Sequence, residues 1–150
     1  MQPSEEQEVI IDQIKQNKNI VIEAVAGSGK TTTLLFISNK YKTKRISLLT
    51  YSRSLKDEIL SKSIPDNLSV FTFHSFASYI YKTVIHNDYL LNTALLKNKI
   101  RDLTEIDILM VDEVQDMTKQ YFLLTSIIIN MFKNIMFCNL ACSLWAVDSW

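Results

Sequence analysis

The sequence predicts an α/β fold in which helices cover both faces of a mainly parallel β-sheet. Short apolar runs alternate along the chain with longer stretches of helical pattern, which is typical of strands joined by helical crossovers. The 150 residues are 47% hydrophobic, enough to bury the core of one domain. Only two glycines and two prolines interrupt the patterns.

Five apolar runs, several of them rich in β-branched residues, have the character of buried parallel strands. They cover residues 19–26, 45–51, 68–73, 107–111 and 134–138. Helices are predicted for residues 4–17, 30–40, 52–62, 74–85, 89–101 and 118–132. No repeat or linker divides the sequence, and residues 65–67 are typical of a turn. We therefore expect residues 1–150 to form a single domain.

The charge balance excludes a disordered chain and a broadly basic nucleic-acid coat. There are 16 basic and 16 acidic residues, so nucleic acid could bind only through local patches. The densest basic run, residues 40–45, precedes a strand, so an exposed turn is favoured over a nucleic-acid patch. Cys138 and Cys142 are too few for a disulfide scaffold and are interpreted as reduced. No apolar run reaches the ~18 residues of a membrane span, so we expect a soluble cytoplasmic or nuclear protein.

Both glycines lie in the octet AVAGSGKT, residues 24–31, which follows a predicted strand and opens a predicted helix. This context is the one in which backbone N–H groups cradle phosphates in a P-loop. Lys30 is expected to reach the β- and γ-phosphates, and the Thr31 hydroxyl to bind Mg²⁺. The candidate nucleotide-binding residues are Ala24, Val25, Ala26, Gly27, Ser28, Gly29, Lys30, Thr31 and Thr32.

Two carboxylates follow the buried strand at residues 108–111. The carboxyl ends of parallel strands form the edge at which open α/β sheets bind ligands. At that edge Asp112 is expected to hold Mg²⁺ through water, and Glu113 to orient and deprotonate an attacking water. With the octet, these residues predict a P-loop NTPase.

The string DEVQD, residues 112–116, after such a loop resembles the UvrD/Rep-like superfamily 1 DNA helicases. The resemblance implies a RecA-like three-layer α/β/α sandwich that binds ATP and Mg²⁺ and couples ATP hydrolysis to DNA unwinding. It also implies that Gln7 reads the adenine edge, although Ser4 and Gln7 fit a capping box as well. Gln115 would belong to the catalytic set and join the nucleotide state to the DNA face.

Two further segments resemble motifs that face single-stranded DNA in this family. Residues 48–58 include Tyr51, Ser52 and Arg53, which suit base stacking and phosphate contact. An ordinary helix cap remains an alternative for Ser52. Residues 70–76, VFTFHSF, resemble the family's TxHSF motif, with Thr72, His74 and Ser75 as its polar members. Without the family, His74 would be interpreted as a structural histidine. The phenylalanines at 71, 73 and 76 are expected in the core rather than on DNA.

The sequence departs from the family in three places. The interval from His74 to Asp112 leaves room for about two helices, where many relatives insert an accessory domain. Residues 139–148 diverge: Asn139, Leu140 and Cys142 stand where the family has Gly, Asp and the Gln that senses the γ-phosphate. A second RecA-like domain has no counterpart in these 150 residues.

Two functions therefore remain open. The first is the ATPase domain of a DNA helicase or translocase, with single-stranded or partly duplex DNA and a second RecA-like domain or chain as partners. The alternative is a truncated nucleotide-binding module without helicase activity of its own. The DEVQD and TFHSF strings weigh against a third interpretation, an unrelated P-loop kinase or switch NTPase.

Overall fold

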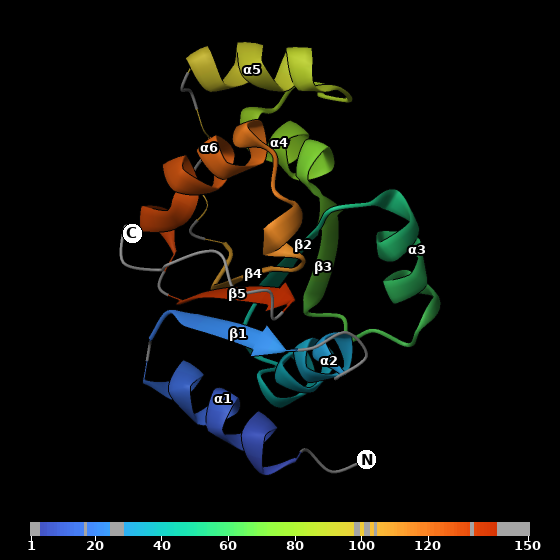
Figure 1. The fold of residues 1–150 in the computed structure, drawn as a ribbon, viewed down its shortest axis with the longest axis vertical. Coiled ribbons are helices and arrows are strands. Elements are labelled where there is room, and N and C mark those ends of the chain that lie inside the picture. Colours follow the sequence, from blue (N-terminus) through green and yellow to red (C-terminus); the bar gives the residue numbers. More distant parts are fainter. Residues whose placement is uncertain are drawn as a thin grey trace.

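A five-stranded, all-parallel sheet organises the chain (Figure 1). The computed structural model describes residues 4–16, 18–24, 29–97, 100, 103, 105–132 and 134–140. The strands are β1 (Ile20–Ala24), β2 (Ile46–Thr50), β3 (Leu68–Thr72), β4 (Ile108–Val111) and β5 (Asn134–Leu140). Their order across the sheet is β1-β5-β4-β2-β3, so β5 separates the strand before the octet from the strand before the two carboxylates. The predicted α/β class and parallel sheet are confirmed.

The described residues also form six α-helices and two short 3₁₀ helices, of which α1 precedes β1 and the others lie between strands. The α-helices are α1 (Glu5–Lys15), α2 (Lys30–Lys40), α3 (Arg53–Ser61), α4 (Phe73–Tyr81), α5 (Asp88–Lys97) and α6 (Lys119–Ile128). The 3₁₀ helices are η1 (Val114–Asp116) and η2 (Ile129–Met131). In Figure 1, α1 and α2 lie on one side of the sheet and α4, α5 and α6 on the other. Helix α5 packs on α4 and α6 and lies farther from the sheet than they do.

Alternating strand residues supply two separate cores, one on each face of the sheet. Leu49, Leu109 and Ile135 pack with buried residues of α4, α5 and α6. Their neighbours Leu48 and Met110 pack instead with buried residues of α1, α2 and α3. Successive side chains of a strand point to opposite faces, so a continuous apolar run can serve both cores. The predicted coverage of both faces is thereby confirmed.

The predicted element boundaries differ from the structure mainly around α4 and α6. Phe73, predicted to end a strand, begins α4 because the Thr72 side chain caps this helix. The helix predicted to reach residue 85 ends at Tyr81, where Lys82 adopts a left-handed conformation with φ of 51°. The last turn of the helix predicted for residues 118–132 is 3₁₀, and η1 was not predicted. The interval between His74 and β4 holds two helices, α4 and α5, as expected.

The basic run at residues 40–45 forms an exposed turn at the amino edge of the sheet, as predicted. Lys44 and Arg45 lie 3.7 and 3.9 Å from the carboxylate of Asp107, which precedes β4. Exposed pairs of this kind contribute little to stability, so the run is best described as solvated. Within the described ranges, no helix is long and apolar enough to cross a membrane.

Helix α5 offers a matched test of this packing. Leu91 is fully buried and Leu96 is 87% exposed, on the same helix. Leu91→Ala should lower the free energy of unfolding by about 2 to 5 kcal/mol, because it leaves a cavity in the core. Leu96→Ala should change it by no more than about 0.5 kcal/mol. Urea denaturation of both variants measures the difference, and equal losses would contradict the placement of α5.

Candidate functional site

Among the described residues, helix α2 lacks the side-chain cap that four of the other helices have. Helices α1, α3, α4 and α6 each follow a Ser or Thr whose side chain accepts a hydrogen bond from a first-turn N–H. Helix α2 follows Gly29, whose φ of +83° suits glycine, and no side-chain cap is found there in the described part of the chain. The first N–H groups of such a helix have no partner within it, and its positive dipole end favours anions.

Asp112 lies at the carboxyl end of β4 and is buried. Its N–H donates to the Leu49 carbonyl of β2 at 2.9 Å, and its Oδ1 accepts from the Glu113 N–H at 3.0 Å. Burial raises the pKa of the Asp112 carboxyl, and the neighbouring Glu113 charge raises it further; Lys30 acts in the opposite direction. A cation bound nearby would therefore be favourable, because it would stabilise the ionised form.

Glu113 faces the start of α2. Its Oε1 lies 4.0 Å from the Nζ of Lys30, whose side chain is nearly buried. Glu113 is held with φ of 54°, which is uncommon for a residue with a side chain and is often found at functional sites. The Gln115 side-chain amide, from η1, donates to Glu113 Oε2. The fold thus brings Lys30, Asp112, Glu113 and Gln115 into one cluster.

Gln7 forms the capping box that the sequence offered as one of its two interpretations. Its side chain completes the capping box of α1 with Ser4, since its Oε1 accepts from the Ser4 N–H at 3.0 Å. Its Nε2 donates to the Thr33 hydroxyl at 2.9 Å, and that hydroxyl donates to the Gly29 carbonyl at 3.1 Å. Gln7 is therefore linked through Thr33 to Gly29, the residue that precedes α2. The contact with Thr33 had no signal in the sequence, because 26 residues separate the two.

Three of the residues predicted to face DNA also take part in helix caps. Ser52 caps α3 by accepting from the Leu55 N–H at 3.1 Å, so the helix-cap alternative is correct. Thr72 and Ser75 form a reciprocal capping box at the start of α4. Tyr51 and Arg53 are exposed. Phe73 and Phe76 are buried, and Phe71 packs against the core, as expected.

His74 belongs to a network that the sequence did not reveal. Its Nε2 lies 3.0 Å from Asp88 Oδ1, at the start of α5. Its Nδ1 lies 3.5 Å from the hydroxyl of Tyr121 on α6. The structural-histidine interpretation is thus supported, and any DNA contact would be additional to it.

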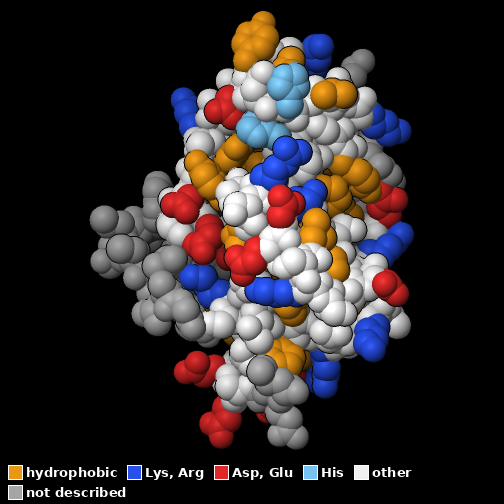
Figure 2. Space-filling model, turned by 90° about the vertical axis from the view of Figure 1, so that its right-hand side faces the viewer, with side chains coloured by type: hydrophobic (Ala, Val, Ile, Leu, Met, Phe, Trp, Pro, Cys, Tyr) orange, Lys and Arg blue, Asp and Glu red, His pale blue; other side chains and the backbone are white. Residues whose placement is uncertain are grey.

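The strand order sets the sequence of groups along the carboxyl edge. Lys30 follows β1, the carboxylates follow β4, Tyr51 follows β2 and His74 follows β3. Neighbouring strands are about 4.8 Å apart, so Tyr51 lies next to the acidic strand end. Figure 2 faces this edge and shows acidic side chains gathered beside basic ones, with histidine on the same face.

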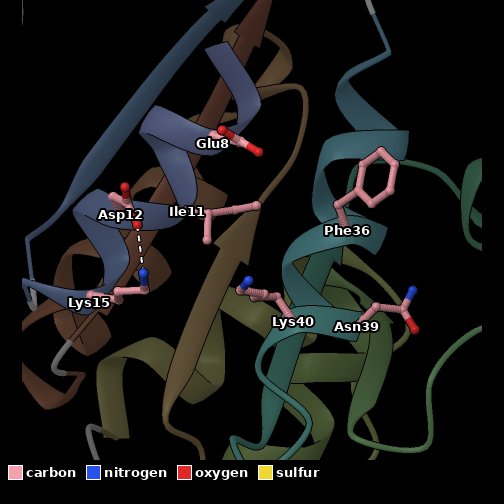
Figure 3. A pocket seen from close by; sticks show the side chains of 7 residues that line it. All are labelled: Glu8, Ile11, Asp12, Lys15, Phe36, Asn39 and Lys40. Atoms are coloured by element: carbon pink, nitrogen blue, oxygen red, sulfur yellow. Dashed lines mark hydrogen bonds and ion pairs between the residues drawn. The ribbon is translucent and has the colours of Figure 1, made fainter. Parts of the chain in front are cut away.

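A cavity of about 630 Å³ lies elsewhere, between α1 and α2 (Figure 3). Its lining extends along α1 and the last turns of α2, away from Gly29, and includes none of the candidate site residues. The lining residues are Glu8, Ile11, Asp12, Lys15, Phe36, Asn39 and Lys40. The Asp12 carboxylate pairs with Lys15 at 2.7 Å, which lowers the pKa of that carboxyl.

Several predicted site residues lie outside the described residues. These are Val25, Ala26, Gly27 and Ser28; Cys142, which departs from the family's pattern, also lies outside them. Ala24 ends β1, and Cys138, Asn139 and Leu140 belong to β5 by their backbone. Thr31 and Thr32 lie in the first turn of α2. Among the described residues, no group of three or more His, Cys, Asp and Glu side chains could hold a metal. The hard oxygen donors Asp112 and Thr31 nevertheless fit Mg²⁺ that is also bound by phosphates.

The parallel sheet, the glycine-led helix after β1 and the acidic end of β4 define the class as a P-loop NTPase fold. A family described as "AAA domain" matches residues 7–138, and the chain belongs to this family. The comparison with curated proteins found no match.

Solved structures of helicases share the fold. A hypothetical ATP-dependent RNA helicase from Sulfolobus tokodaii superposes with a TM-score of 0.61 at 17% identity, over 93% of this chain and 46% of that one. Pif1 helicase from Candida albicans superposes with a TM-score of 0.59 at 19% identity, over 93% of this chain and 32% of that one. Bacteroides Pif1 bound to single-stranded DNA superposes with a TM-score of 0.56 at 20% identity, over 93% of this chain and 32% of that one. The chain spans less than half the length of each, and the predicted RecA-like fold is confirmed.

The buried carboxyl of Asp112 gives a pH-dependent prediction. Because its pKa is raised in the folded state, its ionisation opposes folding as pH rises above the ordinary value of 3.8 through the folded pKa. Without nucleotide or metal, Asp112→Asn should therefore unfold at a higher urea concentration than wild type at pH 7. The difference should shrink as the pH falls towards 4. Urea midpoints across this range measure it, and a variant that is less stable at pH 7 would contradict this expectation.

Proposed function

We propose that this chain binds Mg-ATP and is the ATPase domain of a DNA helicase or translocase. The observation that carries the proposal is the approach of Lys30 Nζ to Glu113 Oε1, 4.0 Å apart, between the start of α2 and the end of β4. A cation at an uncapped helix start, facing two carboxylates, matches the needs of phosphoryl transfer to water. Bacteroides sp Pif1, which shares this fold at 18% identity, was solved in complex with ADP-AlF4, and this supports nucleotide binding as the role of the site.

Each residue has a distinct part in this proposal. The α2 N–H groups and Lys30 would bind the phosphates, while Thr31 and Asp112 would hold Mg²⁺, which would supply positive charge to the bound phosphates. Glu113 takes a proton from the attacking water, and its hydrogen bond from Gln115 fixes the orientation of the carboxylate. Gln7 reads the adenine edge with the second Nε2 hydrogen and the Oε1 lone pair that remain beside its hydrogen bonds with Ser4 and Thr33.

The neighbouring part of the carboxyl edge is proposed to bind single-stranded DNA. Tyr51 and Arg53 are exposed there and combine an aromatic ring with a positive charge, as single-strand binding requires. Ser52, Thr72, His74 and Ser75 would contribute polar groups. Nucleic acid as the partner is supported by Bacteroides Pif1 bound to single-stranded DNA and by the Pif1 helicases solved for DNA unwinding at forked duplex DNA.

Unwinding would require a second RecA-like domain or chain, which this proposal assigns as a partner. Residues 1–150 would then form one nucleotide-binding domain, with Mg-ATP bound at the junction of the two. The alternative is a nucleotide-binding module without helicase activity. The chain covers 32–46% of the helicase chains named above, so the shared fold alone does not extend their unwinding activity to it. Nucleotide binding without turnover in the presence of DNA would select this alternative.

Lys30→Ala should reduce Mg-ATP affinity by about ten- to a hundredfold or more, because it removes the phosphate-facing charge. Hydrogen bonds to charged groups contribute about 1.5–3 kcal/mol, and a low-dielectric site adds to this. Calorimetric titration measures the affinity. Lys40→Ala is the matched control, since Lys40 is exposed at the other end of the same helix and should leave affinity unchanged. Equal affinity in both variants would remove Lys30 from the site.

Glu113→Gln separates binding from hydrolysis. The amide is nearly the same size but cannot accept the proton of water, so turnover should fall by about 10² to 10⁴-fold. Mg-ATP should still bind, because Lys30 and the α2 N–H groups are unchanged. Turnover is measured as phosphate release in the presence of single-stranded DNA, and Mg-ATP affinity is measured by calorimetric titration of the same variant. Wild-type turnover in the variant would exclude Glu113 as the base.

A further inference from the structure

Tyr121 contacts residues that follow both β2 and β3, although it belongs to none of the sequence motifs. It lies in the first turn of α6 and is 7% exposed. Its ring stacks on Phe73 with centroids 4.3 Å apart and planes 4° from parallel. The Thr118 hydroxyl accepts from its backbone N–H at 3.4 Å. Tyr121 is therefore fixed from its backbone and from one ring face.

The Tyr121 ring also packs against the ring of Tyr51. The Tyr51 and Tyr121 centroids are 5.9 Å apart with an interplanar angle of 72°, an edge-to-face contact. Tyr51 lies between the end of β2 and the cap of α3, outside any regular element, and its side chain is 42% exposed. Such aromatic pairs contribute about 0.5–1.5 kcal/mol beyond their buried area. The contact therefore restricts the rotamers available to an otherwise exposed ring.

Tyr121 also contacts the segment after β3. Its ring meets the His74 ring edge-to-face at 5.6 Å and 82°, and its hydroxyl lies 3.5 Å from His74 Nδ1. Burial raises the pKa of the Tyr121 phenol, and the Asp88 carboxylate raises it further, so the hydroxyl keeps its proton. With a proton on Nε2, the His74 ring donates to Asp88, and Nδ1 can accept from the Tyr121 hydroxyl.

We infer that Tyr121 is a positioning residue that holds the Tyr51 ring in the orientation needed to stack on a base of single-stranded DNA. Tyr121 is too buried to stack on a base itself, whereas Tyr51 is exposed and packs against the Tyr121 ring. Fixing a ring before binding lowers the entropy lost on binding. The inference rests on the proposed function, which makes Tyr51 a stacking residue.

A double-mutant cycle tests this inference directly. The affinity of the full chain for a fluorescent oligothymidylate is measured for wild type, Tyr51→Leu, Tyr121→Leu and the double variant. Each single change should weaken binding by up to about tenfold, within the range for one base–aromatic stack. The double variant should bind no more weakly than Tyr51→Leu, because Tyr121 acts through Tyr51. Tyr121→Phe keeps the ring contacts and should bind like wild type.

Two controls separate positioning from a loss of packing. Phe76→Leu removes a fully buried ring from the same core without touching Tyr51, and should leave the affinity within about twofold of wild type. The dependence of affinity on salt should be the same in all variants, because phosphate contacts are unchanged. If Tyr121→Leu fails to fold, Tyr121→Met replaces it in the cycle, because the unbranched Met side chain has a similar volume and adapts better to an irregular space.

Three results would overturn the inference. These are unchanged affinity in Tyr121→Leu, independent effects that multiply to about a hundredfold in the double variant, and a loss in Tyr121→Phe as large as in Tyr121→Leu. A wild-type chain that does not bind the oligonucleotide would instead refute the proposed DNA surface itself. The two failures are thus distinguishable.

Discussion

The parallel alignment of all five strands is the constraint on which the rest of the structure depends. It brings every strand's carboxyl end to one edge, so groups separated by more than 80 residues in the chain meet there. The order β1-β5-β4-β2-β3 then arranges them: the start of α2 lies at one end, the acidic end of β4 in the middle, and the segments after β2 and β3 at the other end. A nucleotide site and a nucleic-acid surface can share one edge because β4 lies next to β2, where the Asp112 N–H donates to Leu49.

Without a ligand, the cluster of Lys30, Asp112, Glu113 and Gln115 lowers the stability of the folded protein. Two adjacent carboxylates share a partly buried region with Lys30, and burial raises the pKa of the Asp112 carboxyl, which disfavours its charged form. Glu113 is held in a backbone conformation that a side-chain residue rarely adopts. Such features persist where the surrounding structure enforces them and where a ligand reverses the cost. A magnesium ion with a polyphosphate would do so, since it brings positive charge to Asp112 and anionic oxygens to Lys30.

Local patterns made most of the fold predictable. The glycine turn before Lys30 indicated the start of α2, and the apolar run before Asp112 indicated β4 and its edge. The structure also bears out the Ser4 and Ser52 caps, because a cap depends on residues only three positions apart. The contacts that were missed join distant positions. His74 meets Tyr121 across 47 residues, and Gln7 meets Thr33 across 26. No local pattern encodes such pairs, since they exist only once the strand order is fixed. The left-handed Glu113 was missed because nothing in its side chain favours that conformation.

The central claim is that the phosphates of ATP bind between the start of α2 and the acidic end of β4. A crystal structure of the chain with Mg²⁺ and a non-hydrolysable ATP analogue tests it most directly. We expect the terminal phosphate beside Lys30 Nζ and the metal on the Asp112 side, with Glu113 facing the γ-phosphate. A nucleotide bound in the cavity between α1 and α2, or one whose phosphates do not contact Lys30, would contradict the claim.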